Sequence, residues 1–155
     1  MFNRHILRIF IMKKIISITA ICISIAGCAS VKMAPSEQNA AARSFSTPKK
    51  NAGLYIYRNE SLGGSVKMDV AIDGMPLGQT VAKTFLYKEI SPGKHTITSV
   101  AENTATISID TKAGNLYYIW QEAKLGILYA RNELHLVDEK EGKQGVSETN
   151  LAETR

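Results

Sequence analysis

Cysteine is scarce in this sequence: only two of the 155 residues, Cys22 and Cys28, are of this type. Cys22 lies inside an apolar segment near the N-terminus, and Cys28 follows shortly after it. The processing argued below removes the first cysteine and modifies the second. The mature chain then has no thiol pair for a disulfide and no thiolate metal site, so its folded part must be stable through its core alone.

A long hydrophobic run is also missing. The most apolar segment, residues 15–26, is shorter than the roughly 20 residues that a membrane-spanning helix needs. It follows Lys13 and Lys14 and ends in small residues, which is typical of a signal peptide. A buried helix of a cytosolic protein would carry an apolar stripe, whereas this segment is apolar on all sides. Translation can begin at Met1 or at Met12.

The chain has no excess of one charge once the signal segment is set aside. In full, it has 19 Lys and Arg residues against 14 Asp and Glu residues. Four basic residues precede the expected cleavage site, namely Arg4, Arg8, Lys13 and Lys14. The remaining 15 basic and 14 acidic residues leave the mature chain nearly neutral, which gives no electrostatic basis for binding nucleic acid.

Catalytic and ligand-binding motifs are absent as well. Only His95 and His135 remain after processing, and neither occurs in a metal-binding spacing such as HExxH. We interpret both as ordinary strand residues. The glycine-rich segment 61–65 lacks the lysine of a P-loop, and the sequence has no G-x-S-x-G motif. The sequence therefore predicts no enzyme activity, no metal and no cofactor.

What the sequence does contain begins with Ile25, Ala26, Gly27 and Cys28. An aliphatic residue, two small residues and a cysteine in this order resemble the lipobox of bacterial lipoproteins. The resemblance implies that residues 1–27 are a signal peptide cleaved after Gly27 and that Cys28 is acylated. Several acyl chains would hold it stably at a membrane, since each buried methylene contributes about 0.8 kcal/mol. Ala29 replaces the aspartate typical of inner-membrane retention, which implies a periplasm-facing position at the outer membrane.

Residues 28–51 are predicted to form the lipidated cysteine and a flexible tether. This segment is rich in Ala, Ser and Thr, contains Pro35 and Pro48, and has Phe45 as its one aromatic residue. Ser36 can cap a brief helix as far as Ala42, but such a short helix is marginal in isolation. As a coil, the tether would reach about 25 Å.

Residues 52–140 contain short β-branched and aromatic runs separated by Gly, Pro, Asn and Asp. This pattern predicts an all-β fold, a small antiparallel β-sandwich of about seven or eight strands. The expected strands are 54–58, 66–72, 77–80, 84–90, 94–101, 105–110, 116–121 and 133–137. Residues 141–155 are expected to form a polar, exposed tail or a short helix, which Asp138 can cap.

Two turns organise the predicted sandwich. Asp73 and Gly74 predict a tight hairpin, and Pro76 keeps the following strand short or at a sheet edge. Ser91, Pro92 and Gly93 predict a second turn, after which residues 94–101 are expected to pair with residues 84–90.

These turns lie within three segments: Val70-Ala71-Ile72-Asp73-Gly74, Leu77-Gly78-Gln79-Thr80 and Ile90-Ser91-Pro92-Gly93-Lys94-His95-Thr96-Ile97. The segments resemble the PEGA-type surface module, a small β-sandwich in which both turns recur at this separation. The chain departs from that pattern at Val81, where proline is usual. From Cys28 onward it also resembles a family of small bacterial lipoproteins with a domain of unknown function, which segments 53–58 and 114–118 fit. Neither resemblance implies catalytic residues.

Aromatic residues near charged ones are the remaining candidates for a binding patch: Tyr57, Arg58, Trp120, Tyr129 and Arg131. Exposed Tyr, Trp and Arg residues are typical of protein interfaces, and aromatic platforms on strands also bind sugars. The alternative is that most aromatic residues simply divide between core and surface, because they are strand formers.

The sequence thus predicts a lipid-anchored envelope protein that acts as a non-catalytic protein-binding or structural module. The alternative is a glycan or peptidoglycan binding module, and a periplasmic hydrolase is a distant third. The expected partners are a membrane, through Cys28, and an envelope protein or a glycan.

Overall fold

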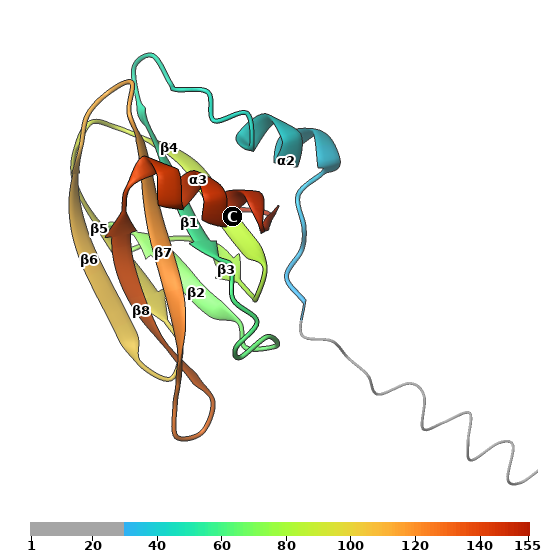
Figure 1. The fold of residues 1–155 in the computed structure, drawn as a ribbon. Helices are drawn as coiled ribbons and strands as arrows, with labels where there is room; N and C mark the ends of the chain where they lie inside the picture. Colours follow the sequence, from blue (N-terminus) through green and yellow to red (C-terminus); the bar gives the residue numbers. More distant parts are fainter. Residues whose placement is uncertain (1–29) are drawn as a thin grey trace, which may run out of the picture.

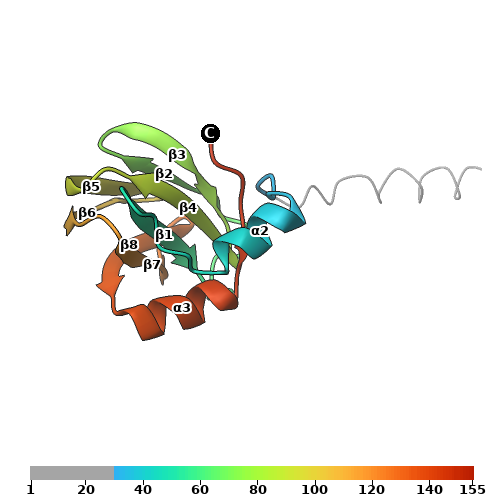
Figure 2. The same cartoon turned by 90° about the horizontal axis from the view of Figure 1, so that it is seen from above.

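Two β-sheets pack face to face in the computed structural model, which describes residues 30–155 (Figures 1 and 2). The five-stranded sheet has the order β8-β7-β1-β4-β9, and the four-stranded sheet has the order β3-β2-β5-β6. The strands are β1 (Ala52–Arg58), β2 (Met68–Ile72), β3 (Met75–Thr80), β4 (Thr84–Ile90), β5 (Gly93–Val100), β6 (Thr104–Thr111), β7 (Leu116–Leu125), β8 (Ala130–Val137) and β9 (Asn150–Leu151). The predicted all-β sandwich is confirmed.

Two features of the pairing differ from the prediction. β1 pairs in parallel with β7, and β4 pairs in parallel with β9, so the sandwich is not purely antiparallel. β5 does not pair with β4, because the turn at residues 91–92 carries the chain from one sheet to the other. β5 pairs instead with β2 and β6.

The β2–β3 hairpin forms as the sequence predicts. Asp73 and Gly74 both have positive φ values, 51° and 79°, as a two-residue hairpin turn of the primed type requires. Pro76 lies on β3, an edge strand of the four-stranded sheet, where its missing N–H is tolerated.

The core between the sheets is mainly aliphatic. Its fully buried side chains include Leu54, Ile56, Ile97 and Ile119. Three polar side chains cross the same interface: Thr80 donates to the Gln121 Oε1 atom, and Gln121 Nε2 donates to Ser99 Oγ at 2.6 Å. Since buried polar groups are costly unless paired, this chain of hydrogen bonds fixes how the two sheets align.

Much of the segment predicted as a flexible tether, residues 28–51, is attached to the folded domain. Residues 36–42 form helix α2 (Ser36–Ala42), which packs on the five-stranded sheet. Tyr55 Oη donates to the Ala42 carbonyl at 2.7 Å, and the Leu151 N–H donates to Asn39 Oδ1 at 2.8 Å. The prediction of a tether through residue 51 is therefore wrong, because small residues and backbone hydrogen bonds attach this segment without a conspicuous apolar run.

The C-terminal segment is also part of the fold. Helix α3 (Glu139–Ser147) is capped by the Asp138 side chain, as expected, which accepts from the Glu141 N–H at 2.9 Å. The predicted exposed tail is wrong: β9 pairs with β4, and Leu151 and Ala152 are buried. A polar composition concealed the two apolar residues that attach this end.

Helix α3 lies against the outer face of the five-stranded sheet (Figure 1). The side chains beneath it form a largely aromatic layer. Gly142 lies directly over Tyr118, and Gly145 lies over Tyr57; a Cβ atom at either glycine would come within 2.1 Å of a ring carbon. This close approach is why helix α3 carries glycine at two interior positions despite the cost to helix stability. Among residues 30–155, no helix combines the length and hydropathy needed to cross a membrane.

Candidate functional site on the β7–β8 hairpin

The outer face of the β7–β8 hairpin carries three cross-strand pairs beside helix α3. Trp120 is opposite His135, Glu122 is opposite Glu133, and Lys124 is opposite Arg131. Residues that alternate along a strand point to the same face, so the six side chains form one ladder. We refer to these six residues as the hairpin face.

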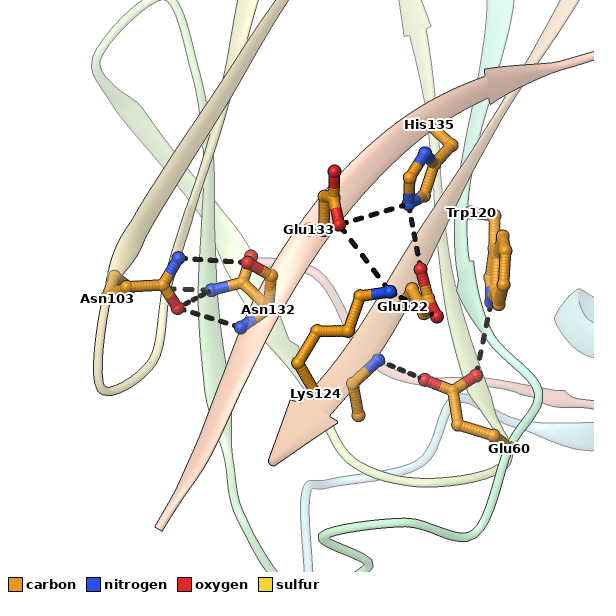
Figure 3. A network of polar contacts seen from close by, with 9 residues as sticks. Glu60, Asn103, Trp120, Glu122, Lys124, Asn132, Glu133 and His135 are labelled. Atoms are coloured by element: carbon orange, nitrogen blue, oxygen red, sulfur yellow. Dashed lines mark hydrogen bonds and ion pairs between the residues drawn. The ribbon is translucent and has the colours of Figure 1, made fainter. Parts of the chain in front are cut away.

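The aromatic end of the hairpin face is partly covered. The rings of Trp120 and His135 lie 5.2 Å apart at 33°. Trp120 Nε1 donates to Glu60 Oε2 at 3.2 Å, and the other Glu60 oxygen accepts from the Ala123 N–H (Figure 3). Trp120 is therefore half-buried and fixed in orientation, with one side of its indole occupied by the imidazole.

The centre of the hairpin face is an ion-pair network (Figure 3). Lys124 Nζ lies 2.7 Å from Glu122 Oε1 and 3.6 Å from Glu133 Oε2, and His135 Nε2 lies 3.0 Å from Glu122 Oε2. The Lys124 ammonium lowers the pKa of Glu122, with a smaller contribution from His135. In return, Glu122 raises the pKa of Lys124.

The carboxylates of Glu122 and Glu133 and the imidazole of His135 bring three atoms of metal-ligand type within 4.8 Å of one another. The Lys124 ammonium already contacts both carboxylates and supplies the positive charge that a cation would bring. We therefore interpret the cluster as a self-neutralised polar surface.

The turn that joins β7 to β8 presents large apolar side chains to solvent. Leu125, Ile127 and Leu128 are 82%, 88% and 85% exposed. The Glu102 carboxylate accepts hydrogen bonds from three successive N–H groups, those of residues 127–129, at 2.8–3.0 Å. These hydrogen bonds lower the pKa of Glu102, and the bond from the Tyr129 N–H has the largest effect. The turn, which we call the tip (residues 125–129), is thus held in one shape.

Two of the five residues predicted for the binding patch are buried and do not belong to it. Tyr57 is 2% exposed beneath helix α3, and Arg58 is fully buried. The Arg58 guanidinium donates to the carbonyls of Val66, Leu62 and Gly63 at 2.7–2.8 Å, so it organises the loop of residues 59–67. Burial lowers the pKa of Arg58, an effect that Glu60 partly offsets.

The other three predicted residues do lie on one hairpin: Trp120 and Arg131 on the hairpin face, and Tyr129 in the tip. The sequence interpretation missed the apolar tip and the Glu122–Glu133–His135 cluster. The signal for the tip was present, because three large apolar residues in a row, 127–129, follow Gly126 between two strands. The cluster had no such signal, because it depends on the strand register. The predicted lipobox residues, Ile25 to Cys28, lie outside the described residues.

The comparisons with known proteins place this chain in a family. The model of the family described as "Protein of unknown function (DUF2846)" matches residues 48–132, which is more than half of the chain. The chain belongs to the DUF2846 family. An uncharacterized protein of Haemophilus influenzae is 36% identical over 138 residues, covering 88% of this chain and 82% of that protein.

The region matched by the DUF2846 model contains β1 to β7, the tip and the first residues of β8. Helices α2 and α3 and strand β9 lie outside it. The match therefore includes the turn that presents the apolar tip, together with Glu102, which holds it.

One hollow of the described DUF2846 fold lies between helix α2 and the five-stranded sheet. Its volume is about 640 Å³. Tyr55 and Tyr87 from neighbouring strands and Glu89 are among its lining residues. This hollow lies away from the β7–β8 hairpin. Burial raises the pKa of Tyr87, so its phenol stays neutral at physiological pH.

The two histidines of the described DUF2846 fold are both paired with carboxylates. His95 Nδ1 lies 2.6 Å from Asp73 Oδ2, and His95 Nε2 lies 2.8 Å from the Ser91 carbonyl oxygen. Both ring nitrogens face acceptors, an arrangement that favours the protonated imidazole, in which both nitrogens donate. The pKa of His95 is raised, mainly by its hydrogen bond to Asp73. Partial burial lowers this pKa, and the hydrogen bond to the Ser91 carbonyl raises it further. The Thr96 N–H and then His95 lower the pKa of Asp73.

The His95–Asp73 pair should make stability depend on pH. Because folding raises the pKa of His95, this group stabilises the fold fully at pH values below its pKa in the unfolded chain, about 6.5, and the contribution is lost as the pH rises through its folded pKa. Because folding lowers the pKa of Asp73, this group stabilises the fold fully only at pH values above its pKa in the unfolded chain, about 4. We expect the difference in melting temperature between wild type and Asp73→Asn to be largest between these values and to shrink as the pH rises through the raised pKa of His95. Asparagine tolerates the positive φ of position 73. Asp110→Asn on β6 is the control, and a difference that stays constant with pH would contradict the pairing.

Proposed function

We propose that this DUF2846 protein is a lipid-anchored lipoprotein of the bacterial envelope, at the periplasmic side of the outer membrane. It acts there as a non-catalytic module that binds a protein partner through the hairpin face. The observation that carries the binding role is the ladder of Trp120, Arg131 and the charged residues between them on an edge hairpin.

The anchor is supported by the lipobox pattern at Ile25 to Cys28 and by the extent of the similarity to the H. influenzae protein. An alignment that covers 88% of the chain must include some of the first 29 residues, because residues 30–155 make up only about 81% of it. Similarity therefore extends beyond the folded domain into the segment that would carry the signal.

A protein partner is supported by the chemistry of the hairpin face. Tryptophan and arginine are the residues most enriched among interface hot spots, and interspersed carboxylates and cations give directional contacts at a polar rim. The network is largely satisfied internally and fixed in shape, which lowers the entropy lost on binding. β8 is an edge strand of its sheet, so the face is open on one side.

A glycan ligand is the second candidate, and the geometry favours it less. Sugar rings stack on the open face of an aromatic side chain. His135 lies against the Trp120 ring, and the indole N–H is already bonded to Glu60, so the platform is only partly available.

The PEGA-type relationship remains part of the proposal and has one supporting contact. The two turns on which that resemblance depends, at Asp73-Gly74 and Ser91-Pro92-Gly93, are joined through His95. A small sandwich with these turns fixed together is a rigid platform for surface recognition.

The binding role is testable by site-specific photocrosslinking in intact cells. A photoreactive amino acid placed at Arg131 or, in a second variant, at Glu133 of the full-length protein should give one discrete protein adduct after irradiation. The matched control is the same amino acid at Lys94, which is exposed on β5 of the other sheet, and it should give no such adduct.

Two outcomes would contradict the protein-binding proposal. Adducts of equal yield from position 94 would show that crosslinking is not specific to the hairpin face. Adducts that disappear on digestion with a peptidoglycan hydrolase, with no protein in them, would establish the glycan alternative.

A further inference from the structure

The tip is the most exposed apolar surface element of the described fold. Leu125, Ile127 and Leu128 each have more than four-fifths of their surface exposed, and Tyr129 and Leu62 beside them are 49% and 43% exposed. A shallow hollow of about 300 Å³ joins Leu62 to the tip residues. Because Glu102 fixes the backbone of residues 127–129, the apolar side chains are displayed by a rigid turn.

The tip is convex. Figure 1 shows the β7–β8 hairpin extending past the other strands at one end of the sandwich. A protruding apolar turn is able to enter a soft, flat surface such as a bilayer, where apolar side chains reach about 5–10 Å into the boundary between headgroups and acyl chains.

The start of the described chain lies beside the loop of residues 59–67, which also borders the tip. Residues 30–32 and Lys67 line one hollow, and Leu62 and Val66, from the same loop as Lys67, line another with the tip. Figure 1 shows the start of the described chain, this loop and the tip in the lower half of the view. Only Ala29 separates Cys28 from Ser30 in the sequence, and two residues of fully extended chain span about 7 Å at most.

That short distance follows from the correction to the tether. Val31 packs against the core, and the Lys32 carbonyl accepts from the Glu153 N–H at 2.8 Å, so the chain is attached to the domain from this point on. A lipidated Cys28 would therefore bring the domain directly onto the membrane, with the loop of residues 59–67 and the tip close to it.

The charges around the tip suit anionic headgroups. Lys67 and Arg131 are exposed beside the apolar residues, whereas Lys124 is already paired with Glu122 and Glu133. The nearest carboxylate, that of Glu102, has its charge covered by three N–H donors. Cations flanking an apolar insertion are the usual composition of an interfacial membrane contact.

We propose that the tip inserts into the interfacial layer of a phospholipid bilayer containing anionic lipids, as a second attachment beside the acylated Cys28. This inference rests on the proposed lipidation. Two attachments fix the orientation of the domain, and the hairpin face then extends from the membrane surface toward a partner.

The first test uses the lipidated protein reconstituted into vesicles of phosphatidylethanolamine and phosphatidylglycerol. Acylation blocks Cys28, so Ile127→Cys provides the single reactive thiol for a bimane label. A lipid-attached spin-label quencher should quench this label strongly. The control is Met75→Cys, which is exposed at the β2–β3 turn, at the opposite end of the strands, and should remain unquenched. Equal quenching at both positions, or none at position 127, would overturn the proposal.

The second test separates the tip from the anchor. The unlipidated polypeptide from Ala29 to Arg155, which contains every described strand and helix, is floated with the same vesicles. Ile127→Ser combined with Leu128→Ser should weaken binding at least about tenfold, and Met75→Ser should not. If labelling with palmitate fails but this difference persists, the lipid anchor is wrong and the tip contact stands. If palmitate is incorporated but the variants bind alike, the tip inference is wrong.

Discussion

Replacing Arg58 with alanine should lower the free energy of unfolding by about 3–5 kcal/mol. The Arg58 guanidinium is fully buried and donates to three carbonyls of the loop that joins β1 to β2. Removing it leaves three partly buried carbonyl acceptors without a donor and opens a cavity where the longest side chain of β1 lay. The loop of residues 59–67 would lose its centre, since this one group bonds to Leu62 and Gly63 in its middle and to Val66 near its end.

The same substitution should also reach the hairpin. A Cβ atom at Gly63 would lie 2.7 Å from the Ala130 Cβ atom, so the loop packs tightly on the start of β8. Glu60, from the same loop, bonds to Trp120 and to the Ala123 N–H. We therefore expect faster amide hydrogen exchange in residues 60–67 and 123–131 of the Arg58→Ala protein, beyond the loss of global stability.

Chemical denaturation of three variants would measure the effect. Arg58→Lys keeps the charge but cannot reach all three carbonyls with the fork of a guanidinium, so its loss should be intermediate. Arg131→Ala removes an exposed arginine from the same sheet and should change stability by less than about 0.5 kcal/mol. A loss below about 1 kcal/mol for Arg58→Ala would show that the loop does not depend on this side chain.

Arg58 also illustrates where prediction from the sequence ends. The position of strand β1 was predicted, but all seven of its residues are buried. A strand with one exposed face alternates between buried and exposed residues, so the prediction of an exposed Tyr57 and Arg58 failed once both faces of β1 proved to be covered. One side of β1 faces the other sheet, and the other side is covered by helices α2 and α3. Both helices come from segments predicted to be largely polar connections, and only tertiary contacts show that they close over this strand.

The strands themselves were largely predictable because their signals are local. Alternation and the turn residues located β2, the Asp73-Gly74 turn and β4 almost to the residue. Which strands pair is not a local property: β1 joins β4 and β7, which lie far apart in sequence. The hairpin face depends on the β7–β8 register, so its pairing of Glu122 with Glu133 could not be obtained from spacing alone.

The tip was a missed prediction of another kind. Residues 125–129 lie between the expected strands 116–121 and 133–137 and were assigned to no element, although they contain four large apolar or aromatic residues. Such residues normally indicate a strand or a core position, and here the strands on both sides had already been assigned. An apolar turn that no other element covers is better understood as a contact surface. In this protein the proposed contact is the membrane to which the N-terminal lipid would also attach.

Replacing Cys28 with serine should abolish acylation completely. The thiol is the group to which the diacylglyceryl moiety would be transferred, and a hydroxyl is a far weaker nucleophile at neutral pH. Processing before Cys28 would also stop, so cells should accumulate a heavier precursor that takes up no labelled palmitate. The matched control is Cys22→Ser, which lies within the apolar segment and should be processed and labelled normally.

The consequence of that loss for the domain follows from the short connection between Cys28 and the fold. Without acyl chains, only the tip would hold the protein at a membrane, and a few apolar side chains give weak, reversible binding. We expect the Cys28→Ser protein, where its precursor is cleaved by other proteases, to be extracted by high salt, whereas wild type should require detergent. Normal processing and palmitate uptake by the Cys28→Ser protein would refute the lipid anchor. If the cleaved Cys28→Ser protein instead resisted extraction by high salt, the domain would have a stronger membrane contact than the tip provides.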